Sequence, residues 1–167
     1  NGGQVKGYYI YIGRRGSNNN VVVTSPGSTW TLNCHTFVGY EGSGNQMTLA
    51  NGAKAVDKFT YINHEAGSSN NSVWVIGTNT AWRNSDNVFV GFNGSRGSLT
   101  ISNGGWVTNL NGCLGFYATS SGNKAIVTGG GAGWQCVDDM LVGFDGSGNS
   151  LTIRNGGRIP DDFGDIV

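Results

Sequence analysis

The sequence is poor in charged residues and in helix-forming residues. Only 12% of its 167 residues are Asp, Glu, Lys or Arg, about half the usual share. It contains two Glu, four Lys, eight Ala and seven Leu, which argues against a helical bundle and against a doubly wound α/β fold. No run approaches the ~18 apolar residues of a membrane-spanning helix, so we expect no membrane insertion.

Net charge, cysteine and histidine are also low. The formal net charge is zero, and because nucleic acids and anionic membranes are bound by basic faces, no nucleic-acid partner is expected. Three cysteines without a Cys-x-x-Cys pair argue against a disulfide scaffold and a zinc site. We interpret Cys34, Cys113 and Cys136 as buried apolar residues. Cys34 and His35 are neighbours, whose side chains point to opposite faces of a strand, so we expect no coupling between them.

Small and polar residues dominate what remains. Gly, Asn, Ser and Thr together make up 78 of the 167 residues. The chain is nevertheless 37% hydrophobic and 11% aromatic, which argues against disorder because disordered chains lack such residues. Polar and small residues that alternate with Val, Ile and aromatic residues predict an all-β protein.

The sequence repeats itself. Trp30, Trp82 and Trp134 lie 52 residues apart, and the segments 36–53, 88–105 and 141–157 are near copies. We therefore divide the chain, as a single domain over residues 1–167, into the repeats 1–50, 51–102, 103–154 and the partial repeat 155–167.

Each repeat is itself double, with an aliphatic residue followed by Gly or Asn every 24 to 28 residues. Three propeller blades of 52 residues would be too few to close a ring. A parallel β-helix (a β-solenoid) fits better, with about six coils that pair ~4.8 Å apart and have Gly and Asn at their corners.

Alternation predicts which side chains face the lumen. These are the pairs Met47/Leu49, Leu99/Ile101 and Leu151/Ile153, together with Val38, Val90 and Val142. The residues before those valines and their equivalents then form an outward ladder of Tyr11, Phe37, Tyr61, Phe89, Cys113 and Leu141. Either this wall packs against a loop, or the faces are reversed, or the ladder is an exposed stripe made for contact.

Tryptophan suggests a second contact. The three recurring tryptophans are expected to pack at a corner of the coil, whereas Trp74 alternates with two valines and is expected to face outward beside the cluster Tyr8, Tyr9 and Tyr11. An exposed indole there could contact a carbohydrate or a protein partner. The candidate contact residues are Tyr9, Tyr11, Phe37, Tyr61, Trp74 and Phe89.

The segments VFVGFNGSRGSLTISNGGWV and VVVTSPGSTWTL resemble the Gly/Ser/Thr-rich repeats of bacterial autotransporter passenger domains and related secreted surface proteins. The resemblance extends to about residue 159. It implies a right-handed parallel β-helix that is secreted and displayed at the cell surface as a stalk or adhesive shaft. Three cysteines and the ending RIPDDFGDIV, which breaks the repeat, depart from the pattern.

Catalytic groups are sparse. Asp86 and Asp138 occupy equivalent positions, two coils apart on one wall, with Asp139 beside the second. Such a pair could flank a glycosidic bond, but carboxylates that recur with the repeat are typical of solvated turns. The stretch 145–149 resembles the start of a calcium loop, yet its copies do not keep the charge. We therefore expect no enzyme activity, metal or cofactor.

Three functions remain open: a non-enzymatic stalk or adhesin of a bacterial surface, a self-assembling filament or matrix subunit, and a carbohydrate-binding or polysaccharide-cleaving β-helix. The expected partners are correspondingly surface glycans, a neighbouring cell surface, or the chain itself. Self-assembly is suggested by repeats that start in phase and by the lack of a polar cap, because uncapped coils expose β-edges.

Overall fold

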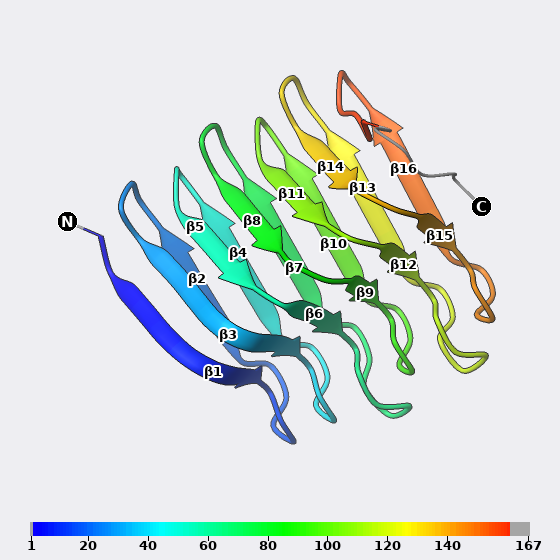
Figure 1. Cartoon of the computed structure of the whole chain (residues 1–167). Helices are drawn as coiled ribbons and strands as arrows, with labels where there is room; N and C mark the ends of the chain where they lie inside the picture. Colours follow the sequence, from blue (N-terminus) through cyan, green and yellow to red (C-terminus); the bar gives the residue numbers. More distant parts are fainter. Residues whose placement is uncertain (1, 161–167) are drawn as a thin grey trace.

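The computed structural model describes residues 2–160, and these contain strands and turns but no helix. A six-stranded parallel sheet contains, in spatial order, β2 (Asn20–Thr24), β4 (Gln46–Ala50), β7 (Ser72–Ile76), β10 (Ser98–Ser102), β13 (Lys124–Thr128) and β16 (Ser150–Arg154). Adjacent strands come from adjacent coils, so the chain passes this sheet once per coil (Figure 1).

The second sheet has ten strands and two arms. Its long strands β1 (Gln4–Ile12) and β3 (Thr29–Val38) run along both arms. In later coils the arms separate: one contains β5 (Lys54–Asp57), β8 (Ala81–Asn84), β11 (Trp106–Asn109) and β14 (Gly133–Cys136), and the other contains β6 (Phe59–Ile62), β9 (Val88–Val90), β12 (Gly112–Leu114) and β15 (Met140–Val142). All the pairings are parallel, which confirms the predicted β-solenoid of about six coils.

The lumen holds the aliphatic ladders that alternation predicted. Met47, Leu49 and Ile101 are fully buried, and Leu99 is 2% exposed. Ile153 continues the same ladder in β16 but is 45% exposed, because β16 has a paired strand on one side alone among the described residues. The assignment of the lumen-facing side chains is therefore confirmed. At β16, Leu151 packs partly buried against the core and Ile153 pairs with the fully buried Val127, but no further coil among the described residues covers Ile153.

The three recurring tryptophans lie inside the core, and not merely at a corner of the coil. Trp30, Trp82 and Trp134 are at most 3% exposed. A buried indole N–H needs an acceptor, and each finds one: Trp30 donates to Thr36 Oγ1 at 3.0 Å, Trp82 to Asp57 Oδ1 at 3.2 Å and Trp134 to Asn109 Oδ1 at 2.5 Å. The 52-residue period thus repeats a buried ring, and in the second and third repeats it also repeats the acceptor, at the equivalent positions Asp57 and Asn109.

A buried ladder of asparagines links the coils at the corner after the second arm. The Asn45 side chain donates to Asn71 Oδ1 at 2.9 Å, and Asn123 donates in the same way to Asn149. Each such asparagine fills the space beside a corner glycine of the preceding coil. At Gly39, whose φ is 76°, an added Cβ would lie 1.9 Å from Asn71 Nδ2. Glycine is therefore required there both by the backbone and by the neighbouring coil.

At one place in the stack the corner glycine and the ladder asparagine are exchanged. Asn63 stands where the other corners have glycine, and Gly97 stands where the other coils have the ladder asparagine. The Asn63 side chain takes over the contacts: Asn71 Nδ2 donates to Asn63 Oδ1 at 2.5 Å, and Asn63 Nδ2 donates to the Ser95 carbonyl at 2.6 Å. The swap keeps the buried polar ladder satisfied without adding volume.

Candidate functional site

Two rows of stacked rings run along the second arm and the turn after it. The first row, predicted from the sequence, contains Tyr11, Phe37, Tyr61 and Phe89, with ring centroids 4.7 to 5.2 Å apart and planes within 9° of parallel. The second row lies in the turns and contains Tyr40, His64, Phe92, Phe116 and Phe144, with centroids 4.6 to 5.3 Å apart. Edge-to-face contacts join the rows, for example between Phe37 and Tyr40.

The second row was not predicted, although the sequence carries its signal. In five successive coils, the residue two positions after the inward-facing aliphatic residue that precedes the corner Gly or Asn is aromatic or, in one coil, His64. These turn rings cover the strand rings, so Phe37 and Phe89 are only 5% and 7% exposed. The exposed stripe is therefore wrong for these two residues and for Cys113, which the predicted ladder also placed on the outer wall and which is 1% exposed. The alternative of a wall packed against a loop describes Phe37 and Phe89. Face-to-face stacking also hides the ring faces that a sugar would need.

The remaining candidate residues do not form one site. Tyr9 and Tyr11 are exposed on the ten-stranded sheet, and Tyr61 is half-buried in the first aromatic row. Trp74 belongs to the other sheet, in β7. The prediction that Trp74 lies beside the tyrosine cluster is wrong, because the two sheets present different faces of the coil.

Cys34 and His35 are coupled, contrary to the sequence analysis. The Cys34 Sγ lies 3.2 Å from His35 Nε2. The two residues lie where β3 passes from one arm to the other, and the pairing of β1 with β3 has a bulge there, so strict alternation does not hold. Burial and the charge of Lys58 lower the pKa of His35.

The other two cysteines match the interpretation as apolar core residues. Cys113 is 1% and Cys136 is 4% exposed, and both are free thiols. Burial raises the pKa of Cys113 to about 12 and that of Cys136 to about 11. Thiols are nucleophilic as thiolates, so neither residue is activated.

Asp86 and Asp138 occupy the predicted wall at the predicted separation of two coils. The Asp138 amide donates to the Leu110 carbonyl, and the Leu110 amide donates to the Asp86 carbonyl, so the two aspartates lie two coils apart. Among residues 2–160, no three His, Cys, Asp or Glu side chains gather as metal ligands.

Asp57 is a carboxyl group inside the core, 2% exposed. Desolvation raises its pKa to about 7, against hydrogen bonds from Thr36 and Trp82 that favour the charged form. The Thr60 hydroxyl donates its one proton to Asn84 Oδ1 at 2.6 Å, so its 3.3 Å contact with Asp57 Oδ2 is a hydrogen bond when Asp57 carries a proton. No substrate reaches this group; it belongs to the core.

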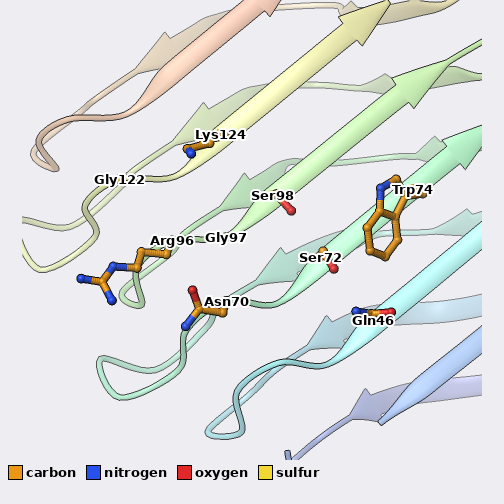
Figure 2. A pocket seen from close by; sticks show the side chains of 9 residues that line it. All are labelled: Gln46, Asn70, Ser72, Trp74, Arg96, Gly97, Ser98, Gly122 and Lys124. Atoms are coloured by element: carbon orange, nitrogen blue, oxygen red, sulfur yellow. The ribbon is translucent and has the colours of Figure 1, made fainter. Parts of the chain in front are cut away.

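A shallow hollow of about 730 Å³ lies over the six-stranded sheet. Figure 2 shows its lining, with the indole of Trp74 on β7, Arg96 at the rim and Lys124 at the start of β13. The other side chains that line the hollow are neutral and polar, namely Gln46, Asn70, Ser72 and Ser98. Arg96 and Lys124 are exposed and make no ion pair with the described residues.

A second hollow, of about 520 Å³, lies over the first arm of the other sheet and also combines a tryptophan with cations. Here the Trp106 ring is already covered, because the Arg158 guanidinium lies 5.0 Å from its centroid. Trp74, in contrast, makes no ring contact within the described part of the chain. The hollow at Trp74 is therefore the stronger candidate for binding a ligand.

No protein-family model, curated protein or solved structure matches this chain. Its function must therefore be inferred from its fold and from the geometry of its faces. Within residues 2–160 no helix could span a membrane.

Proposed function

We propose that this chain is a non-enzymatic β-solenoid module that serves as a structural stalk or adhesin segment on a bacterial cell surface. The observation that carries the proposal is the uniform stacking of the coils. Apart from the bulge between β1 and β3, parallel strands continue in register from coil to coil in both sheets. A rod of this kind holds whatever it displays at a fixed distance and orientation.

The interior supports the same role, because its periodic elements stabilise the stack. The asparagine ladder, the buried tryptophans and the aromatic rows each join one coil to the next. The carboxylates on the outer wall, such as Asp86 and Asp138, recur with the repeat, which is typical of solvated turn residues. These features favour a mechanical function over a catalytic one, as the resemblance to autotransporter passenger repeats also does.

Surface display can be tested on intact cells that produce the full-length protein. Antibodies against residues 2–160 should label unpermeabilised cells, and external protease should remove the label while a cytoplasmic marker stays intact. Labelling that requires permeabilisation would overturn the proposed location. Release of reducing ends from polysaccharides by the purified chain, abolished in Asp138→Asn, would overturn the non-enzymatic assignment.

A head-to-tail filament is a second candidate, favoured by the exposed core of β16. Ile153 is 45% exposed, whereas its equivalent Ile101 is fully buried. Any coil docked on β16, from the same protein or from a second copy, would bury it. Light scattering over a concentration series separates the two, because only self-assembly gives a mass that grows with concentration.

A further inference from the structure

In a repetitive array, a residue that departs from its equivalents is informative, and three such departures meet at one hollow. The first is Trp74. Its outward row on the six-stranded sheet consists of Val22, Thr48, Trp74, Thr100, Ile126 and Thr152. Trp74 is the one aromatic member of this row, and its direct neighbours are the small residues Thr48 and Thr100. The indole is half-buried and lines the hollow.

The second departure is Lys124, two coils away from Trp74. Its row consists of Asn20, Gln46, Ser72, Ser98, Lys124 and Ser150, so it is the one charged residue among neutral hydrogen-bonding side chains. The row crosses the hollow from β4 to β13. Three strand spacings of ~4.8 Å give a width of about 14 Å.

The third departure is Arg96, which adopts a left-handed backbone conformation. Its φ is 57°, and the equivalent positions are Asn18, Gly44, Asn70, Gly122 and Gly148, all with positive φ. Glycine and asparagine adopt this conformation routinely, whereas an arginine is strained in it. A strained arginine in a row that otherwise contains only Gly and Asn indicates that its side chain serves a function.

The charge of this face selects the ligand. The six strands of the sheet contain no Asp or Glu, whereas Lys124 and Arg154 lie on the outer face and Arg96 lies at its rim. Because Arg96 and Lys124 lack ion-pair partners among residues 2–160, they are available to an anion.

We propose that this hollow binds an anionic polysaccharide. The indole face of Trp74 stacks on the apolar face of a sugar ring. Arg96 and Lys124 bind carboxylate or sulfate groups, and the amide and hydroxyl side chains between them exchange hydrogen bonds with sugar hydroxyls. A volume of about 730 Å³ suits a short stretch of such a polymer. This inference deepens the proposed function as an adhesin. It rests on that function only in assuming that the chain meets the polymer at a cell surface.

The repeats themselves supply the test variants. Trp74→Thr, Arg96→Gly and Lys124→Ser each restore the residue type of the equivalent positions, so folding should be retained. Arg96→Gly should even raise the melting temperature, because it removes the left-handed arginine. Lys6→Ser is the matched control, since it removes one exposed positive charge from the other sheet, away from both hollows.

Binding is measured by calorimetry with polygalacturonate and dextran sulfate, with neutral dextran and oligodeoxythymidine as comparisons. We expect the chain to bind at least one polyanionic polysaccharide and not neutral dextran. Trp74→Thr and Lys124→Ser should each weaken binding about tenfold or more, and Lys6→Ser should leave it unchanged.

Several outcomes would overturn the proposal. Equal losses in Lys6→Ser and Lys124→Ser would indicate general charge attraction, and an unchanged affinity in Trp74→Thr would exclude the indole. Tighter binding of oligodeoxythymidine would identify a single-stranded nucleic-acid site instead. Absence of binding to every polyanion would remove this site, while the labelling of intact cells would still decide surface display on its own.

Discussion

Replacing Asp57 by Asn should change how the stability of the protein depends on pH. Asp57 has its pKa raised from 3.8 to about 7 by burial. In the unfolded chain the carboxyl loses its proton near pH 4, but in the fold it keeps the proton up to about pH 7. Between these values the folded state binds more protons than the unfolded state, so the free energy of unfolding falls as the pH rises.

The size of this effect follows from the shift. Three pKa units correspond to roughly 4 kcal/mol, a large part of the ~5–15 kcal/mol that stabilises a typical domain. The Asp57→Asn variant has no carboxyl to ionise at this position and should lose this pH dependence. It also loses the hydrogen bond from the Thr36 hydroxyl to Asp57 Oδ2, 2.5 Å long, which costs about 1 kcal/mol. The variant should therefore be about 1 kcal/mol less stable at pH 4 and about 3 kcal/mol more stable at pH 8.

The molecule contains its own control. Asn109 is the repeat equivalent of Asp57, and it accepts the indole N–H of Trp134 as Asp57 accepts that of Trp82. Asn109→Asp should introduce the same buried carboxyl one repeat later. Its loss of stability should be several kcal/mol at pH 8 and much smaller at pH 4.

Urea unfolding, followed by tryptophan fluorescence, measures the free energy of unfolding of the wild type, Asp57→Asn and Asn109→Asp from pH 4 to 8. The histidines are common to all of them, so differences between the curves isolate the carboxyl. Parallel curves for the wild type and Asp57→Asn over this range would refute the protonated, buried Asp57.

Three further changes probe the stack. Ile101→Ala should lower the free energy of unfolding by about 2–5 kcal/mol because Ile101 is fully buried in the lumen. Thr100→Ala, on the outer face, should lower it little. Equal effects of the two variants in urea unfolding would contradict the assignment of faces. Asn63→Gly and Gly97→Asn should each lower the melting temperature, the second because an added Cβ meets Asn63 Nδ2 at 2.8 Å. The double variant should recover most of the loss. Additive losses would argue against the exchange of asparagine and glycine between these two positions. Cys113, whose pKa burial raises to about 12, should react with iodoacetamide only when the chain unfolds, as mass spectrometry of native and urea-treated protein would show.

The sequence was sufficient to predict the coil and its lumen because both depend on periodicity. Spacings of 24 to 28 residues leave few closed β-folds, and alternation in strands such as SLTIS determines which side chains face inward. The structure confirms this at Leu99 and Ile101. The directions of side chains near the corners of the coil were harder to predict from the sequence. A bulge in β3 interrupts the alternation there and brings the side chains of Cys34 and His35 together.

The outer surface was predicted less well, for a different reason. The sequence identifies Phe37 as outward from its strand, but its exposure depends on whether the following turn folds back over it, and Tyr40 does so. Trp74 was correctly assigned to an outer face but wrongly placed beside the tyrosines, because the order of faces around a coil depends on the angle at each corner. Periodicity carries no information about that angle.

Departures from the repeat fall into two kinds, and the difference between them separates structure from function. Two departures inside the core are compensated. The extra side chain of Asn63 is offset by Gly97 in the next coil. Asp57 stands where the next repeat has the neutral Asn109, and its raised pKa keeps the carboxyl neutral as well. A compensated change preserves the fold and requires no other explanation. Trp74 and Arg96 have no such counterpart in the stack, and Arg96 adds backbone strain. Residues that cost stability without repairing a neighbour are retained for contacts outside the chain, which is why the hollow between them, rather than the more aromatic wall, is the place to look for a ligand.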